Sequence, residues 1–321
     1  MDSTGPETSI VIPTHGGKFL GAAVASVVAQ TVPDWELVIV DDGSTDGTAT
    51  VAAALAAADA RIRVVTQPNR GIARARNRGL AEISRLARYV ALVDHDDLWM
   101  PDTLEILRDA LLRRPAASAA HGLVTSIDDD GWPTPYLDSG RGLPWNRFHV
   151  VNGRVELWPV DRPTQFAVLA YEDCVVGTGS GLIRRATLDR AGAFDWRAEP
   201  ADDYDLWIRL SRLGEIAFVG RVVLAYRQHE ARRSLGPPPP RAHGTGYVRH
   251  KLVTSPENTP AQHRLAIAGF RAHERMLLGE RWSNLVGAWT RREYAALPRQ
   301  LAAMLSRATS YARGCPWSWQ R

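Results

Sequence analysis

The sequence predicts an α/β protein in which a doubly wound, mostly parallel sheet is followed by a C-terminal helical extension. Short apolar runs alternate with segments of helical length through residues 1–115, which is typical of parallel βαβ units. Polar clusters follow several of these runs, as expected where ligands bind beyond the carboxyl ends of the strands. Residues 261–321 show only helical segments.

The elements of the first half follow from this alternation. The strands are predicted from apolar runs rich in valine, isoleucine and leucine. One helix is rich in alanine, and another has a proline in its first turn, where the missing N–H is tolerated. The expected strands are Ser9–Ile12, Glu36–Val40, Arg61–Thr66 and Tyr89–Val93, and the expected helices are Phe19–Gln30, Gly47–Ala58, Ile72–Leu86 and Pro101–Arg113.

The second half is less regular. Residues 128–163 are rich in Gly, Pro, Asp and Trp, which indicates an irregular insertion or a β-hairpin. Four consecutive prolines in Gly236–Pro240 indicate a stiff connector. The other expected strands are Ala117–Ser126, Gly179–Arg184 and Val222–Arg227, and the other expected helices are Asp202–Leu213, Gln262–Leu278 and Trp282–Ala308.

These features divide the chain into three parts. Residues 1–235 are expected to form the main domain, with halves 1–115 and 116–235 and the insertion 128–163 in the second half. Residues 236–260 are expected to be a proline-rich linker, and residues 261–321 a helical region.

The composition is that of an ordinary globular protein, with 45% apolar and 23% charged residues. Cys174 and Cys315 are the only cysteines, which argues against a disulfide framework and a cysteine-rich zinc site. Lys18 and Lys251 are the only lysines, and the scattered arginines behind the net charge of +4 do not indicate nucleic-acid binding. No uncharged run reaches the roughly 18 residues that span a membrane, and the polar N-terminus does not resemble a secretory signal, so we expect a cytoplasmic protein.

Residues Asp94–Asp97 read Asp-His-Asp-Asp and directly follow the apolar run Tyr89–Val93. Carboxylates at the exit of a buried strand suit a hard cation such as Mg²⁺ or Mn²⁺, which binds one or two carboxylates together with phosphate oxygens. Three carboxylates in four positions also repel one another unless a cation or hydrogen bonds offset their charge. The alternative is a polar turn before the helix that begins near Pro101.

A second acidic pair, Asp41 and Asp42, follows another apolar run and precedes a glycine-containing turn. Asp42 could accept a hydrogen bond from the imide N–H of uracil or thymine, whereas Asp46 is expected only to cap the next helix. Arg74 and Arg76 are two residues apart and cannot share a helix face. We therefore expect Arg76 to reach the ligand phosphates or base and the other arginine to be solvated.

Asp202 and Asp203 open the predicted helix Asp202–Leu213. The helix dipole favours negative charge there, which is a sufficient structural reason for both residues. A carboxylate near a metal-bound diphosphate could instead take a proton from an attacking hydroxyl. His229 follows the last predicted strand, and it is either a metal or phosphate ligand or an exposed histidine.

Taken in order, these motifs resemble glycosyltransferase family 2, the inverting enzymes with a GT-A fold. The resemblance covers roughly residues 8–235, and Asp94-His95-Asp96 matches the family's D-x-D motif. The segments that carry it are Ile10–Thr14, Val40–Asp46, Gly71–Asn77, Leu92–Trp99, Asp202–Trp207 and Tyr226–His229.

The resemblance implies a nucleotide-diphosphate-sugar donor, with the UDP or dTDP type favoured, and Mg²⁺ or Mn²⁺ as cofactor. Residues 1–115 would be the nucleotide-sugar-binding half of the catalytic domain, and residues 116–235 the acceptor half. The implied nucleotide-sugar ligands are Pro13, Thr14, His15, Asp42, Arg76 and Asp94, the implied metal ligands are Asp96, Asp97 and His229, and the implied base is Asp203. Two residues depart from the family pattern, because His15 stands where tyrosine is usual and Asp202 replaces a glutamate.

The implied reaction transfers one sugar, with inversion, to a hydroxyl or amine of a small-molecule, glycan or peptide acceptor, in glycan or natural-product biosynthesis. A nucleotidyltransferase of sugar-nucleotide metabolism and a non-catalytic nucleotide-binding homologue stay open as alternatives. A nicotinamide dehydrogenase is disfavoured because no G-x-G-x-x-G follows the first strand. Trp282 and Trp289 are seven residues apart on one helix face, so residues 281–321 are expected to contact a partner, an acceptor, a membrane surface, the catalytic domain or a second copy in a homodimer.

Overall fold

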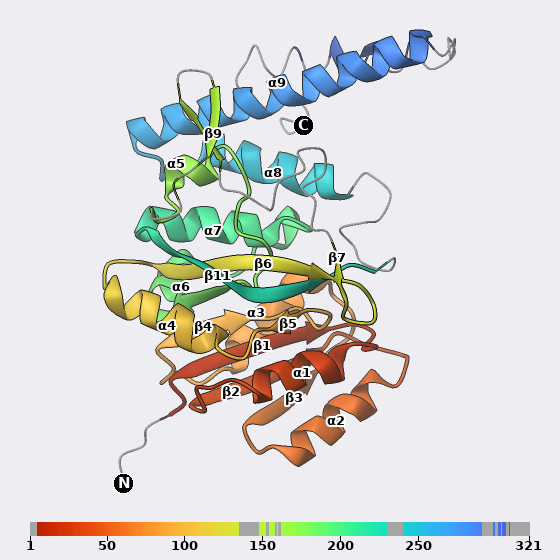
Figure 1. The fold of residues 1–321 in the computed structure, drawn as a ribbon, viewed down its shortest axis with the longest axis vertical. Coiled ribbons are helices and arrows are strands. Elements are labelled where there is room, and N and C mark those ends of the chain that lie inside the picture. Colours follow the sequence, from red (N-terminus) through yellow and green to blue (C-terminus); the bar gives the residue numbers. More distant parts are fainter. Residues whose placement is uncertain are drawn as a thin grey trace.

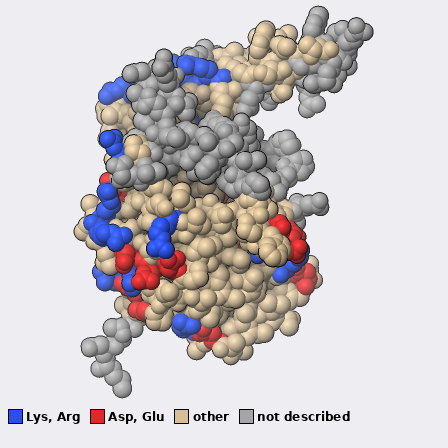
Figure 2. Space-filling model, viewed as in Figure 1, with Lys and Arg blue, Asp and Glu red and all other residues tan. Residues whose placement is uncertain are grey.

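The fold was obtained as a computed structural model, which describes residues 5–134, 148–151, 154–157, 159, 162–229 and 240–290, together with 298, 301, 302, 304, 305 and 308. Within these residues the centre of the molecule is a nine-stranded sheet in the order β3-β2-β1-β4-β10-β6-β11-β5, with β7 paired to β6 (Figure 1). On the face drawn in Figure 2, Lys and Arg side chains lie beside Asp and Glu side chains.

The first half confirms the predicted alternation. Strands β3, β2, β1 and β4 are neighbours and all parallel. Successive strand residues point to opposite faces, so Ile10 and Ile12 belong to the core cluster that includes residues of α1, α2 and α4, whereas Val11 belongs to the cluster that includes residues of α3 and α7. The bounds are β1 Thr8–Thr14, α1 Leu20–Val28, β2 Trp35–Asp41, α2 Thr48–Ala58, β3 Ile62–Thr66, α3 Ile72–Glu82, β4 Tyr89–Leu92 and α4 Thr103–Arg113.

The second half adds antiparallel strands to the sheet. Strand β10 lies between β4 and β6 and is antiparallel to both, and β5, which the sequence did not indicate, pairs antiparallel with β11. The insertion contains a two-stranded hairpin, β8 with β9. The bounds are β5 Leu98–Trp99, β6 Ala119–Ile127, β7 Pro133–Thr134, β8 Phe148–Val151, β9 Arg154–Leu157, α5 Phe166–Leu169, β10 Gly181–Arg184, α6 Arg185–Ala191, the 3₁₀ helix η1 Trp196–Ala198, α7 Asp202–Leu213 and β11 Ile216–Arg227.

Several predicted boundaries were wrong. Helix α3 ends at Glu82 and not at Leu86. Helix α4 begins at Thr103 and not at Pro101, because Pro101 and the next residue form a turn before it. Strand β11 begins at Ile216, six residues before the predicted Val222. Gly220 breaks the apolar pattern at this point, and the ladder between β11 and β6 shifts its register between Phe218 and Val222.

The C-terminal part also differs from the prediction. Residues 236–260 were expected to be a linker, but α8 spans Pro240–Thr254, and its residues Val248 and Leu252 are buried. Proline fits at a helix start, so the prolines do not prevent this helix. The two expected helices are one helix, α9 Pro260–Thr290, as far as the structure describes them. Helices α7, α8 and α9 lie one above the other (Figure 1). Among the described residues no helix has the length and apolarity to cross a membrane.

Candidate active site

A cleft of about 920 Å³ lies where the parallel strands β2, β1 and β4 end. The carboxyl ends of neighbouring parallel strands meet at one sheet edge, so the polar segments after them come together as predicted. The cleft is lined by every residue predicted for the site except Asp97: Pro13, Thr14, His15, Asp42, Arg76, Asp94, Asp96, Asp203 and His229. Their roles stay predictions, but their convergence is a property of the fold.

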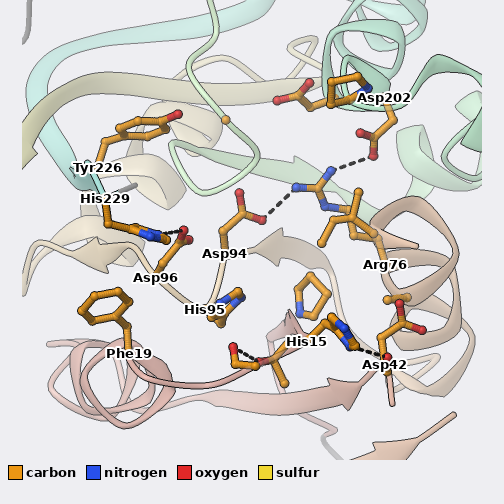
Figure 3. A pocket seen from close by; sticks show the side chains of 18 of the residues that line it. His15, Phe19, Asp42, Arg76, Asp94, His95, Asp96, Asp202, Tyr226 and His229 are labelled. Atoms are coloured by element: carbon orange, nitrogen blue, oxygen red, sulfur yellow. Dashed lines mark hydrogen bonds and ion pairs between the residues drawn. The ribbon is translucent and has the colours of Figure 1, made fainter. Parts of the chain in front are cut away.

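Three carboxylates form an acidic cluster at one end of the cleft. Oxygens of Asp94, Asp96 and Asp97 lie within 4.8 Å of one another. His229 Nε2 lies 2.9 Å from Asp96 Oδ2, and its ring contacts the Phe19 ring in a tilted arrangement with the centroids 5.2 Å apart (Figure 3). Carboxylates with one imidazole fit Mg²⁺ or Mn²⁺, with the imidazole favouring Mn²⁺ of the two.

Asp97 belongs to this cluster but also has a structural role. Its Oδ1 accepts a hydrogen bond of 3.0 Å from the backbone N–H of Arg227, and its side chain is buried. The Arg227 side chain in turn donates to the carbonyl of Asp96 at 3.0 Å. Asp97 therefore fixes the end of β11 against the acidic turn, which brings His229 to Asp96.

Arg76 connects the acidic cluster to the start of α7. Its guanidinium donates to Asp94 Oδ1 at 2.8 Å and to Asp202 Oδ2 at 2.6 Å, and Figure 3 shows it between the two carboxylates. Burial lowers the pKa of Arg76, but Asp202, Asp94 and Asp203 raise it more, so the pKa lies above its usual value. As predicted, Arg74 points elsewhere, since it is exposed and lies 4.1 Å from the Trp196 ring.

The two aspartates that open α7 have different surroundings. Asp202 is buried and paired with Arg76, whereas Asp203 is half-buried and lines the cleft. Burial and the charge of Asp202 raise the pKa of Asp203 to about 6, although Arg76 and the N–H of Tyr204 act in the opposite direction. A carboxylate with such a pKa can accept a proton near neutral pH better than an ordinary aspartate.

Asp42 shapes the entrance to α3. Its Oδ1 accepts hydrogen bonds from the Gln67 side chain at 2.7 Å and the Arg70 N–H at 2.9 Å, and its Oδ2 accepts from the Gly71 N–H at 2.9 Å. Gly71 has a φ of 91°, which other residues rarely adopt. A carboxylate has about four acceptor positions, so three internal bonds leave about one for a ligand.

His15 lies beside Asp42 and is exposed, so its ring is accessible from the cleft. Its Nδ1 lies 2.9 Å from the carbonyl oxygen of Asp42, which requires Nδ1 to be the donor (Figure 3). Its Nε2 lies 3.0 Å from the Asn69 amide. Asp46 accepts a hydrogen bond from the N–H of Thr48, the first residue of α2, at 3.2 Å, although the N-cap residue of this helix is Gly47.

Several contributors to the site were not found from the sequence, among them Glu199, Thr245 and Phe19. Glu199 accepts a hydrogen bond from the Ala73 N–H at 3.0 Å and so caps α3. Thr245, on α8, lines the cleft, and so does Phe19, whose ring contacts the His229 ring. Glu199 lies shortly before Asp202 in the chain but no local pattern marks it, and Thr245 lies in the segment that was expected to be a linker.

Comparisons with known proteins agree with this arrangement. The profile of the family described as Glycosyl transferase family 2 matches residues 9–190. The chain is similar to TuaG of Bacillus subtilis (strain 168), a glycosyltransferase assigned to teichuronic acid biosynthesis, with 36% identity over 135 residues that cover 41% of this chain and 52% of TuaG. It is also similar to the chondroitin synthase of Pasteurella multocida (strain Pm70), with 25% identity over 218 residues that cover 68% of this chain and 20% of that protein. The matched region is thus about half or less of the length of these relatives.

Solved structures show the same fold. S. aureus TarS 1–349 in complex with UDP-GlcNAc superposes with a TM-score of 0.60 at 16% identity, covering 83% of this chain and 72% of that chain. The mannosyltransferase PcManGT from Pyrobaculum calidifontis, in complex with GDP-Man and Mn²⁺, gives a TM-score of 0.50 at 18% identity, covering 99% of this chain and 89% of that chain. The predicted GT-A fold is therefore confirmed. Because the family profile matches more than half of its residues, the chain belongs to glycosyl transferase family 2.

Proposed function

We propose that the chain is an inverting glycosyltransferase, which moves one sugar from a nucleotide-diphosphate-sugar to an acceptor hydroxyl or amine with a divalent cation. The observation that carries the proposal is that one cleft contains both the Asp94–Asp96 cluster with His229 and a carboxylate, Asp203, with a raised pKa. A uracil or thymine base is favoured because Asp42 retains about one acceptor position for an imide N–H.

Each residue has a separate task in the proposed reaction. Asp96 and His229 would hold the cation, which when bound offsets the negative charge developing on the leaving diphosphate. Asp203 would take the proton from the acceptor oxygen or nitrogen as that atom attacks the anomeric carbon. Attack from the face opposite the diphosphate inverts the configuration. Arg76 neutralises Asp202, so Asp203 is the carboxylate of the pair that is left to exchange a proton.

The metal requirement is tested by calorimetric titration with UDP and dTDP, with and without Mn²⁺. We expect measurable binding with Mn²⁺ and much weaker binding after EDTA treatment. Asp96→Asn should lose most of the metal-dependent affinity and most transfer activity while keeping its fold, because it removes a carboxylate ligand and keeps its size. Asp109→Asn, which removes a carboxylate on α4 whose side chain is 42% exposed, is the control. Equal affinity of the wild type with Mn²⁺ and with EDTA would show that no metal is needed.

Two activity assays on the purified protein distinguish the proposed function from the alternative functions. A nucleotidyltransferase would release pyrophosphate from a nucleoside triphosphate and a sugar phosphate, and we expect none. A non-catalytic homologue would bind the nucleotide but fail in an acceptor screen. A ligand at 100 times its dissociation constant adds roughly 2.7 kcal/mol of stability, so a thermal-shift panel of UDP, dTDP and GDP with Mn²⁺ identifies the base first.

The raised pKa of Asp203 predicts a specific pH dependence. The base must be ionised to act, so the transfer rate at saturating substrates should rise with pH and level off above about 6. In Asp202→Asn the neighbouring charge that raises this pKa is absent, so the acidic limb should move to lower pH. A pH–rate profile of the two proteins measures the displacement. If the acidic limb stays in place in Asp202→Asn, then the limb does not report the pKa of Asp203.

We also propose that the C-terminal helix α9 carries the contact surface that was predicted from the sequence. Trp282 is 58% exposed and Val286 is 43% exposed on α9, which is an uncommon position for a tryptophan. The side chain of Trp289 and most of residues 291–321 lie outside the described residues. Peripheral membrane contact and a homodimer are the two proposals, and co-sedimentation with anionic vesicles at low salt and light scattering distinguish them.

A further inference from the structure

We propose that helix α8 positions the catalytic base, with Gly244 and Lys251 acting as positioning residues. Both contact the segment 195–205, which carries Asp203. The inference rests on the proposed function for the role of Asp203. Its structural part, that α8 immobilises this segment, is independent of turnover.

The first contact is a close approach of two backbones. A Cβ atom on Gly244 would lie 2.6 Å from the carbonyl oxygen of Ala198 and 2.8 Å from that of Glu199. Atoms do not approach this closely without repulsion, so only glycine lets α8 lie against this turn. The same turn is fixed from its other side, because the Glu199 carboxylate accepts the Ala73 N–H at 3.0 Å. The turn just before Asp203 is therefore held between α8 and the start of α3.

The second contact is a charged bridge over the segment. Lys251 Nζ lies 3.0 Å from Asp195 Oδ2 and 2.7 Å from Asp205 Oδ1, so one ammonium joins residues on both sides of Asp203. The Tyr247 hydroxyl also donates to Asp195 Oδ2 at 3.0 Å. Burial raises the pKa of Asp195, but the bonds from Lys251, Arg197 and Tyr247 lower it below its usual value.

The bridging residue is one of only two lysines among 39 basic residues of the chain. A lysine ammonium is a compact charge that can lie between two carboxylates, whereas the planar arginine fork pairs best with a single one. The Asp205 side chain is almost fully buried, at 4% exposure, so the bridge is largely shielded from solvent on that side. A lysine therefore fits the position between the carboxylates of Asp195 and Asp205 better than an arginine does.

Helix α8 also reaches the cleft itself. Thr245, the residue after Gly244, lines the cleft, and Arg249 donates to the Tyr171 carbonyl at 2.9 Å. Asp173, shortly after Tyr171, lines the cleft too. One helix therefore contacts both the segment of the base and a second segment that lines the same cleft. Because the family match ends at residue 190, both α8 and the base segment lie outside the matched region.

The test compares Lys251→Met and Gly244→Ala with Lys251→Arg and with the control Arg114→Met. The control breaks an ion pair of 2.6 Å with Glu215, at the sheet edge away from the cleft. Hydrogen–deuterium exchange is measured on the full chain for residues 195–205, with β1 as the internal reference. We expect exchange at 195–205 to rise by about 10-fold or more in Lys251→Met and Gly244→Ala, with β1 unchanged and with UDP–Mn²⁺ affinity within about twofold of wild type.

The turnover number kcat is the second measurement, because a purely structural role of Gly244 and Lys251 would not change it. Where wild type transfers sugar, kcat should fall by about 10-fold or more in both variants with the donor KM unchanged, and Lys251→Arg should recover part of it. Unchanged exchange at 195–205, or faster exchange in β1 to the same degree, would overturn the proposal. If wild type transfers no sugar to any acceptor, the proposed function fails, and the exchange result still decides whether α8 holds this segment.

Discussion

Asp203→Asn is expected to slow sugar transfer by about 10²- to 10⁴-fold, which is the usual effect of removing a positioned base. Asparagine keeps the shape of the side chain but cannot take the proton from the acceptor. The nucleotide affinity should stay unchanged, because Asp203 lies on α7 and the acidic cluster and Asp42 lie at the ends of β4 and β2. Initial rates at saturating donor and acceptor, with calorimetry of UDP–Mn²⁺, measure both quantities.

The matched control for this prediction is Asp202→Asn. Asp202 is buried and bonded to Arg76, so it is not available to an acceptor, and its loss should reduce the rate much less. Near-normal turnover of Asp203→Asn would make the assignment wrong. Asp202 and Asp205 would then be the next candidates, although Asp205 is already bonded to Lys251 and Arg209.

The folded state of Asp203→Asn should be more stable than that of wild type above pH 6. The folded-state pKa of Asp203 is raised from 3.8 to about 6, so the folded protein binds this proton more tightly than the unfolded chain does. The resulting stability is fully present below about pH 4 and is lost as the pH rises through about 6. Asparagine cannot ionise and avoids that loss, so its Tm in EDTA should exceed the wild-type Tm at pH 7.5. A Tm difference that is the same at pH 4 and pH 7.5 would contradict the raised pKa.

The convergence of the predicted segments at one cleft depends on topology. Neighbouring parallel strands end at one edge, so the segments after β1, β2 and β4 had to meet once the alternation of strands and helices was recognised. The opposite faces of Arg74 and Arg76 follow from the helix period alone. These inferences use local pattern and one rule of sheet geometry, and the structure confirms both.

The remaining features depend on tertiary contacts that leave no local signal. Residues 240–254 form a helix because Val248 and Leu252 are buried against the rest of the protein, although the prolines before them indicated a linker. Strand β5 has only two residues and exists because β11 pairs with it. The ion pairs of Arg76 join residues 18 and 126 positions apart, so no sequence spacing could predict them.

Among the substitutions considered, Arg76→Met is expected to lower the free energy of unfolding most. The loss should be about 3–5 kcal/mol, which is typical when one partner of a buried ion pair is removed. Methionine fills a similar length but leaves Asp94 and Asp202 facing each other without the cation between them. Urea unfolding at pH 7.5 measures the loss. Arg74→Met is the matched control on the same helix, and it should cost less than about 1 kcal/mol because it removes only an exposed contact with Trp196.

A double variant distinguishes this explanation from simple loss of packing. In Arg76→Met with Asp202→Asn the uncompensated charge of the more deeply buried carboxylate, Asp202, is gone and only that of Asp94 is left, so part of the stability should return, and the two changes should not be additive. Removing Arg76 also removes a charge that lowers the pKa of Asp203, so in the single variant the acidic limb of the rate should move to higher pH. If Arg76→Met and Arg74→Met lose equally little stability, then Arg76 does not hold the two carboxylates in solution, and the link between the acidic cluster and α7 must be made by other contacts.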